Sequence, residues 1–371
     1  GVKFYKSNND SQQGPGSSKS DADFEFNLVD FPNYYNQSKY NYPNLNYSLF
    51  GENIFYFSDK LSLTPGFRFE YIKTESDGFY KKINLDGAGN VILNSTIDDS
   101  EIRKRNFFLF GLGVSYKASK SIELYGNISE NYRSVTFADI SISNPAYSIN
   151  PNISDENGFT FDLGLRGDYF KKFSYDIGLF SLFYNDRIGF VQKAFKDGSV
   201  KSEKGNVGNA VMYGLESIID FDLNEIFIKN NDYIFNYFIN SSFINSEYTK
   251  SDEPGVEGKK VEFVPELNLK SGFKFGYKNL ILNIQYTFLS SQFTDASNAV
   301  NSGLSGLIGE IPSYEILDFS ASYFFDKFKI ETGLNNLLNS RYFTRRATGY
   351  PGPGIIPSEP RSVYLTIQFK N

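Results

Sequence analysis

Apolar and polar residues alternate along many short segments of this chain, and this two-residue period constrains the fold more than any other feature. In LSLTPGFRFEY, residues 61–71, apolar side chains occupy the odd positions and polar or small residues the even ones. Successive side chains of a β-strand point to opposite faces, so the pattern predicts a strand with one apolar and one polar face. The segments FTFDLGLRGDYF (159–170) and PELNLKSGFKFGY (265–277) repeat it.

The same alternation recurs, less regularly, in the rest of the chain. It is present in 45–57, 107–116, 122–133, 174–187, 207–220, 233–245, 280–290, 315–325, 328–336 and the terminal segment from Val363. We count about thirteen strands, many of them close to the ~9 to 11 residues that a tilted strand needs to cross a bilayer. Residues 1–6 are a candidate for one more strand.

The predicted connections alternate between short and long. Short turns are expected at 58–60, 117–120, 171–172, 277–279 and 325–327, with a looser one at 221–232. Long polar connections are expected at 77–105, 134–156, 191–206, 249–263, 293–313 and 338–360. A soluble β-sandwich or propeller has no reason to sort its connections by length, whereas an outer-membrane barrel has short turns at one end and long loops at the other.

Charged residues recur on the face opposite the aromatic side chains. They are Arg68, Glu70, Glu123, Asp162, Arg166, Lys270, Lys274, Asp318, Lys329 and Glu331. An ordinary protein core would bury these charges at a high cost, but a water-filled lumen accepts them. We therefore predict an all-β fold, a transmembrane antiparallel β-barrel in the bacterial outer membrane. A soluble all-β fold is the alternative.

Composition supports the barrel and excludes several functions. Aromatic residues reach 18%, with 38 Phe and 27 Tyr, more apolar surface than a soluble domain easily hides. The chain has no Cys and no His, which excludes disulfides, thiolate metal sites, zinc sites with His ligands and a Ser-His-Asp triad. The net charge of −6 argues against a nucleic-acid partner. We expect no cofactor and no enzyme activity, although an outer-membrane enzyme or adhesin that uses carboxylates is a further class.

The C-terminal end carries the most specific signal. The segment TGLNNLLNSRYFTRRATGYPGPGIIPSEPRSVYLTIQFKN resembles the C-terminal end of TonB-dependent outer-membrane receptors. The residues that carry the resemblance are Leu334, Asn336, Leu337, Asn339 and Tyr342, together with Phe369, which lies two residues before the last position. The segments SLFGENIFYFSDKLSLTPGFRFEY, ENYRSVTFADIS and TRRATGYPGPGIIP resemble the ferric-dicitrate branch of that family. The likeness covers roughly residues 45–371.

The resemblance implies a larger protein than this chain. Receptors of this kind resemble plugged barrels of about 22 strands, energised through a short motif near the N-terminus. Residues 1–371 are then the C-terminal portion of the barrel, with no plug domain, and residues 1–44 are a first strand followed by an extracellular loop. The chain begins with Gly1 and shows no signal peptide, so we expect a mature or truncated product. A complete barrel of about fourteen strands, acting as a passive porin, is the alternative.

The resemblance also implies a substrate and partners. They are a ferric siderophore or ferric citrate, the missing N-terminal plug and strands, the TonB complex that the missing part contacts, and outer-membrane lipid. Related branches take other siderophores, cobalamin or glycans, so the cargo itself stays open.

Four residues are candidate substrate contacts. On the predicted strand 122–133, Arg133 has lumen parity and lies at the long-loop end. Four of the ten arginines fall in the last 31 residues, among them Arg345 and Arg346, and a guanidinium binds a carboxylate through two hydrogen bonds. Gln292 lies in SSQFTDASN, another family-like segment, but it has lipid-face parity if strand 280–290 continues that far. The alternative for each arginine is a pair with loop acids or with lipopolysaccharide phosphates.

Overall fold

The chain forms one large β-sheet. The computed structural model describes residues 1–16, 26–32, 37–140, 147–194, 200–302, 306–347 and 354–369. The main sheet runs in chain order through β1 (Val2–Gln13), β2 (Ser38–Glu52), β4 (Leu61–Leu85), β5 (Val91–Ser119), β6 (Ile122–Arg133), β8 (Glu156–Tyr169), β9 (Phe173–Ala194), β10 (Val200–Asp222), β11 (Tyr233–Lys250), β12 (Leu267–Tyr277), β13 (Leu280–Leu289), β16 (Tyr314–Phe325), β17 (Phe328–Asn335) and β20 (Ser362–Phe369). Two short strands, β3 (Phe55–Tyr56) and β7 (Tyr147–Ile149), pair with β4 and β10.

Neighbouring strands on the main path are antiparallel and consecutive, which is the topology predicted from the alternation. Each predicted strand, including the candidate at the N-terminus, corresponds to a strand of this path. The helical elements in the described residues are α1 (Phe137–Ile140) and a five-residue π-helical turn, η1 (Asn224–Ile228). None of the helices within the described ranges is long and apolar enough to cross a membrane.

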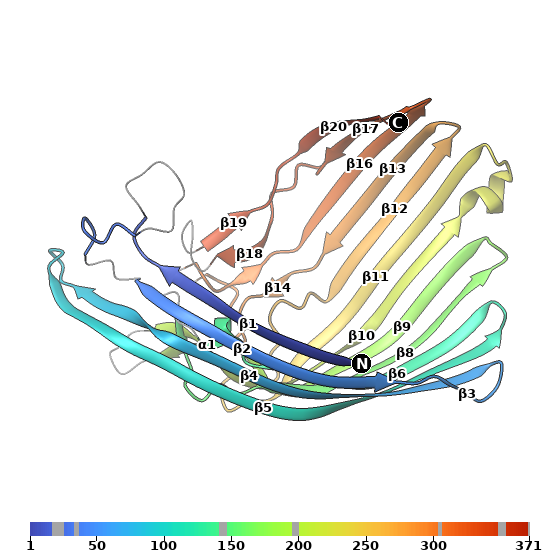
Figure 1. Cartoon of the computed structure of the whole chain (residues 1–371). Coiled ribbons are helices and arrows are strands. Elements are labelled where there is room, and N and C mark those ends of the chain that lie inside the picture. Colours follow the sequence, from blue (N-terminus) through green and yellow to red (C-terminus); the bar gives the residue numbers. More distant parts are fainter. Residues whose placement is uncertain are drawn as a thin grey trace.

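The sheet curves into an open trough (Figure 1). β1 and β20 form its two edges, and within the described ranges they do not pair with each other. The final strand therefore pairs with β17 on one side and leaves its other side open in this chain.

The two faces of the sheet separate as the alternation predicts. Phe67 faces Phe110 across β4 and β5, and Leu163 faces Leu179 across β8 and β9, so apolar residues form continuous rows on one side. Phe67 is 43% exposed and Leu163 48% exposed, so these rows are not covered by any other part of the described chain. Such a surface is stable against lipid and not against water. The predicted lipid-facing side is thus the uncovered side.

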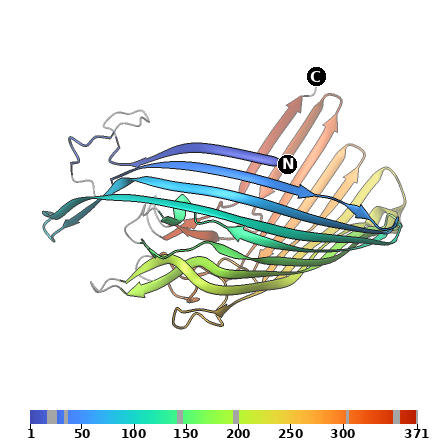
Figure 2. The same ribbon diagram turned by 60° about the horizontal axis from the view of Figure 1, so that its bottom comes forward.

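The connections sort by length onto opposite ends of the trough. The short turns lie at one end, while α1, β14 (Gln292–Phe293), β18 (Phe343–Ala347) and β19 (Gly354–Pro357) lie at the other end, inside the curve (Figures 1 and 2). β14 pairs with β15 (Glu310–Ile311), and β18 pairs with β19, as small separate sheets. The expected connection 338–360 is therefore partly strand, and its residues 348–353 lie outside the described ranges.

Two expected long loops are mostly strand, which corrects the sequence prediction. Most of segment 77–105 extends β4 and β5 beyond their apolar parts, and residues 86–90 make the turn. Segment 191–206 likewise extends β9 and β10. β1 continues to Gln13 and β2 begins at Ser38, so the first connection is shorter than the expected 7–44. These extensions lack an apolar face, but strand pairing needs only the backbone hydrogen bonds that each strand offers its neighbour.

We expect a charge on the apolar face to destabilise the protein. Phe67→Arg and Leu163→Arg each lower the free energy of unfolding by ~2 to 4 kcal/mol if these residues lie near the bilayer midplane. Urea titration of the protein folded in phospholipid vesicles measures this. Thr64→Arg, on the opposite face of β4, is the matched control. Equal tolerance of all three substitutions contradicts a lipid-facing side.

We also expect residues 1–371, expressed alone, not to form a stable monomeric barrel. The free edges of β1 and β20 leave backbone amides and carbonyls without partners in lipid. Heat-modifiable migration on gels reports a closed barrel. A folded, heat-modifiable monomer would instead support the smaller complete barrel.

Candidate functional site

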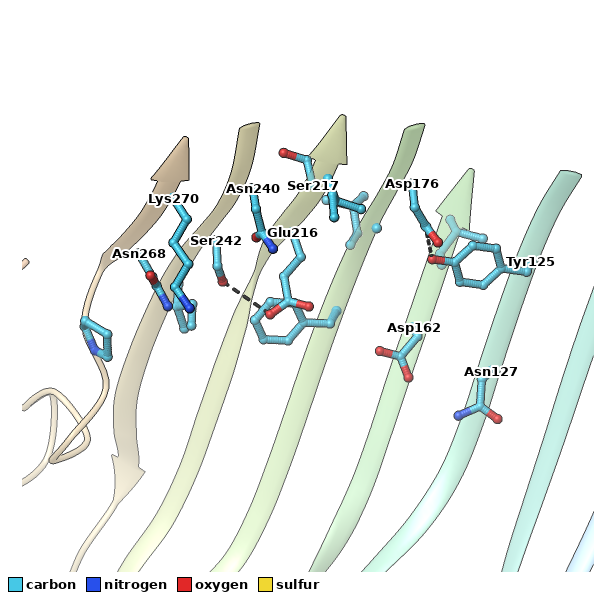
Figure 3. Close-up of a pocket in the computed structure, with 17 residues that line it drawn as sticks. Tyr125, Asn127, Asp162, Asp176, Glu216, Ser217, Asn240, Ser242, Asn268 and Lys270 are labelled. Carbon is cyan, nitrogen blue, oxygen red and sulfur yellow. Dashed lines mark hydrogen bonds between the residues drawn. The ribbon is translucent and has the colours of Figure 1, made fainter. Parts of the chain in front are cut away.

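The inner face of the trough contains an acidic hollow of about 750 Å³. Carboxylates reach it from three consecutive strands: Asp162 from β8, Asp176 from β9 and Glu216 from β10 (Figure 3). The hydroxyl of Tyr125 donates to Asp176 at 2.6 Å, and the hydroxyl of Ser242 donates to Glu216 at 3.2 Å. The hollow is a polar surface that water or a polar partner can occupy.

Glycine makes one of these contacts possible. The ring of Tyr125 on β6 crosses over Gly164 of β8 to reach Asp176 on β9. A Cβ at position 164 would lie 2.1 Å from that ring, so only glycine fits beneath it. The close approach fixes the tyrosine across the wall of the hollow.

The charges of the hollow are not balanced. Asp162, Asp176 and Glu216 have no ion-pair partner among the described residues, and Lys270 is the cation that lines the same hollow. The described residues contain no group of three or more carboxylates that could hold a metal ion. The unpaired carboxylates of the hollow therefore favour hydrogen-bond donors and cations.

Arg133, the first predicted anion contact, is already paired with two acids. It lies at the end of β6, where Nη1 is 3.0 Å from Glu156 and Nη2 is 3.0 Å from Asp139. Lys204 is 2.6 Å from the same carboxyl of Asp139. Burial by itself would raise the pKa of Asp139, but hydrogen bonds from Lys204 and Thr136 outweigh it and hold the pKa below its usual value. Arg133 thus balances buried carboxylates.

A second pair anchors the same connection, residues 134–155. The guanidinium of Arg105 lies 2.6 Å from Asp155 and donates to the carbonyl of Val135 at 3.3 Å, while the amide of Val135 donates to Asp155 at 2.7 Å. Val135 packs with Ile153 and Ile188 in a small buried apolar cluster. The connection is therefore fixed against the wall by ion pairs and apolar packing together.

Arg346 has a different environment from Arg133. It lies on β18, where Nη1 donates to the carbonyl of Gly306 at 3.2 Å and Nη2 to that of Glu310 at 3.0 Å. Its Nε is buried and has no hydrogen-bond partner, and its guanidinium stacks 5.4 Å from the ring of Phe343. Burial lowers the pKa of Arg346. Within the described ranges no carboxylate pairs with this side chain, while its neighbour Arg345 is exposed.

The ten arginines divide into two sets. Six of them each pair with a carboxylate: Arg68, Arg103, Arg105, Arg133, Arg166 and Arg187. The other four make no ion pair in the described part of the chain, and they are Arg341, Arg345, Arg346 and Arg361. All four lie in the connection between β17 and β20, at the long-loop end of the sheet. The arginines without an internal counter-charge in the described residues therefore all lie in one connection.

Gln292 does not lie where the sequence pattern would put it. β13 ends at Leu289, and Gln292 belongs to β14, opposite Ile311 of β15. The condition for lipid-face parity is thus not met, and the side chain is 8% exposed. Gln292 is a buried residue of a small separate sheet.

Sequence reasoning missed the residues that anchor connection 134–155. Arg105 fell in a segment predicted as loop, and its partner Asp155 is 50 positions away. The sequence did show several acidic residues in a long predicted connection, and arginines close to the ends of the flanking strands. Nothing in the spacing indicates which acid meets which arginine.

Comparisons with known proteins agree with this architecture. A family model described as "TonB dependent receptor-like, beta-barrel" matches residues 2–337. A search of curated proteins finds no match. Solved structures that resemble the chain include the ferric yersiniabactin uptake receptor FyuA from Yersinia pestis, at 16% identity and TM-score 0.68 over 90% of this chain and 46% of that chain.

Two further solved structures have different cargoes. The ferric citrate transporter FecA, in its unliganded form, matches at 20% identity and TM-score 0.65 over 90% of this chain and 55% of that chain. The copper transporter OprC matches at 14% identity and TM-score 0.65, covering 90% and 53%. The chain therefore spans about half the length of the solved proteins it resembles. At these identities the likeness shows the fold alone.

We expect Asp139→Asn to release connection 134–155 from the wall. The substitution leaves Arg133 and Lys204 without a shared carboxylate and lowers the free energy of unfolding by ~1 to 3 kcal/mol. Limited proteolysis should cut this connection faster than in the wild type. Asp98→Asn, at an exposed position of β5, is the control. Equal proteolysis of both variants contradicts the anchoring role.

The lowered pKa of the Asp139 carboxyl predicts that the attachment of connection 134–155 to the wall depends on pH. The pKa of Asp139 is lower in the folded state than its unfolded value of ~3.9. The contribution of this carboxylate to holding connection 134–155 is therefore complete above pH ~3.9 and is lost as the pH falls through the lowered pKa. Proteolysis of connection 134–155 should therefore accelerate at acid pH in the wild type. The proteolysis rate of Asp139→Asn should not show this acceleration, because residue 139 then carries no titrating carboxyl group.

Proposed function

Because the chain belongs to the TonB-dependent receptor-like β-barrel family, we propose that it is part of an active transporter that imports a ferric chelate, ferric citrate or a related siderophore, with energy from the TonB complex. The family consists of outer-membrane receptors and transporters, not enzymes, and the chain is an outer-membrane β-barrel protein. The cargo and the energy source are the proposed part.

The observation that carries the cargo proposal is the set of four arginines without carboxylate partners. A ferric complex of a carboxylate chelator is anionic, and the chelator already fills the coordination sites of the metal. Its receptor therefore needs fixed cations and hydrogen-bond donors, not metal ligands. A chain without His or Cys can supply these groups through arginine, whose guanidinium matches a carboxylate geometrically.

Among the candidate residues, Arg346 and Arg345 are the preferred anion contacts. Two backbone carbonyls orient the guanidinium of Arg346 without neutralising its charge, and its buried Nε has no hydrogen-bond partner. Arg345 is the adjacent exposed cation on the same strand. For Arg133 we propose a supporting role, since its guanidinium already pairs with two carboxylates. Gln292 is a weak candidate because its side chain is buried.

We propose that further strands and a plug domain complete the protein. Two features support this: the free edges of β1 and β20, and the chain's coverage of about half of each similar receptor. The unpaired carboxylates Asp162, Asp176 and Glu216 then face the plug, and basic or amide groups on its surface would satisfy them.

Ferric citrate binding to the full-length receptor tests the proposed contacts. The double variant Arg345→Ala, Arg346→Ala should weaken binding by ~2 to 5 kcal/mol, as expected for a charge pair that the bound ligand desolvates. Arg133→Ala should have a smaller effect, and Arg166→Ala, whose arginine pairs with Glu123 at 3.0 Å, should have almost none. Isothermal titration calorimetry measures all four proteins.

Each outcome has a separate meaning. Unchanged affinity in the double variant eliminates these arginines as the anion site. A wild type that binds no ferric citrate removes citrate as the cargo, and ferric complexes of other carboxylate siderophores are then titrated in the same way.

A further inference from the structure

Side chains on the outer face of the first four main strands change along the strand from apolar to cationic in β1, β4 and β5, while β2 stays apolar or aromatic. In order, the outer-face residues are Val2, Phe4 and Lys6 on β1; Leu49, Tyr47 and Leu45 on β2; Phe69, Tyr71 and Lys73 on β4; and Phe108, Asn106 and Lys104 on β5. Each series runs from the lipid-facing part toward the long-loop end. The change takes four positions, or ~13 Å of strand.

The strand register places these residues in three adjacent rows. Directly opposed residues in antiparallel strands share a face. Lys6 lies opposite Leu45, Leu45 opposite Lys73, and Lys73 opposite Lys104. We call Lys6, Lys73 and Lys104 the lysine row.

The neighbouring row is aromatic on β1, β2 and β4 and ends at Asn106 on β5, and the row beyond it is apolar. Phe4 and Tyr47 lie with ring centroids 5.1 Å apart, and Tyr47 and Tyr71 with centroids 6.1 Å apart. Tyrosines next to an apolar band mark the boundary between lipid tails and headgroups in outer-membrane barrels. The lysine row therefore lies on the headgroup side of this boundary, where long lysine side chains reach polar groups.

A surface hollow of about 1160 Å³ lies at the lysine row. Its lining includes Lys6 and Lys73 on its two sides, with Pro43 and Leu45 of β2 between them. The pairing of β2 with β4 is interrupted at Pro43, because register resumes only from Asn41 on one side and Asn44 on the other. Small and apolar side chains between two lysines leave room for a group of headgroup size.

The charges around the hollow are mixed, and the two lysines of the row without an ion pair in the described residues are Lys6, which lines the hollow, and Lys104, which lies beside it in the row. Lys73 pairs with Glu75, and Asp77 also lines the hollow. Lys6 and Lys104 are exposed, and neither forms an ion pair within the part of the chain that the structure describes. A cation on the headgroup side of a membrane boundary contributes attraction for anionic lipid.

We propose that the lysine row binds the phosphate groups of an anionic membrane lipid, whose acyl chains lie along the aromatic and apolar rows below. The hollow receives the headgroup, and the lysines neutralise its phosphates. This site is on the outer surface of the barrel wall, separate from the arginines at the long-loop end, and it does not depend on which cargo the protein transports.

Binding of lipid A to the full-length protein in neutral detergent micelles tests the site. Native mass spectrometry counts bound lipid across a titration with diphosphoryl lipid A. The triple variant Lys6→Gln, Lys73→Gln, Lys104→Gln should weaken binding by about 10- to 100-fold, given the attraction that each lysine near a membrane surface supplies. The matched control replaces three exposed lysines of the short turns, Lys120, Lys171 and Lys278, by Gln.

Three results would overturn the proposal. One is equal loss of lipid in the triple variant and its control, which indicates a non-specific charge effect. Another is equal binding of lipid A without phosphates. The third is inorganic phosphate that binds the wild type as tightly as the lipid does, because the site then recognises a free anion. The single variant Lys104→Gln, at an exposed position, repeats the test if the triple variant folds poorly.

Discussion

The hydrogen-bond ladder between antiparallel strands is the interaction on which the rest of this structure depends. In lipid no water can satisfy a backbone amide or carbonyl, so each strand must pair on both sides. The ladder is continuous from β1 to β20, and its register aligns the side chains of neighbouring strands into rows. The apolar outer rows, the polar inner wall and the lysine row all follow from this register.

Ion pairs have a second, more local role at the long-loop end. The connection after β6 is held against the wall through Arg105 with Asp155 and through Arg133 with Asp139. Buried carboxylates of this kind are stable only when cations face them, so these arginines are committed to the fold. The arginines between β17 and β20 are not committed in this way. The difference between a structural and an available arginine is therefore a difference in partners, which residue type cannot reveal.

The sequence predicted the strands well and the connections less well. A two-residue period is visible wherever one face meets lipid and the other meets water, so Phe67 and Leu163 were assigned to the correct face. Beyond the membrane both faces meet water, the period disappears, and 77–85 and 91–105 looked like a loop although they continue β4 and β5. Alternation could not assign a face to Gln292 for a related reason, because it holds only within one continuous strand and β13 ends at Leu289.

The sequence by itself determined the class of the fold, the two faces of each strand, and the resemblance to a transporter family, because these depend on local periodicity and short motifs. Only the tertiary structure decided which arginines are neutralised, since Arg133 meets Asp139 and Glu156 through folding of a connection that has no period of its own. It also decided that Lys6, Lys73 and Lys104 lie in one row, although they are far apart in the chain. Register sets such distances, and register is a property of paired strands, not of any one segment.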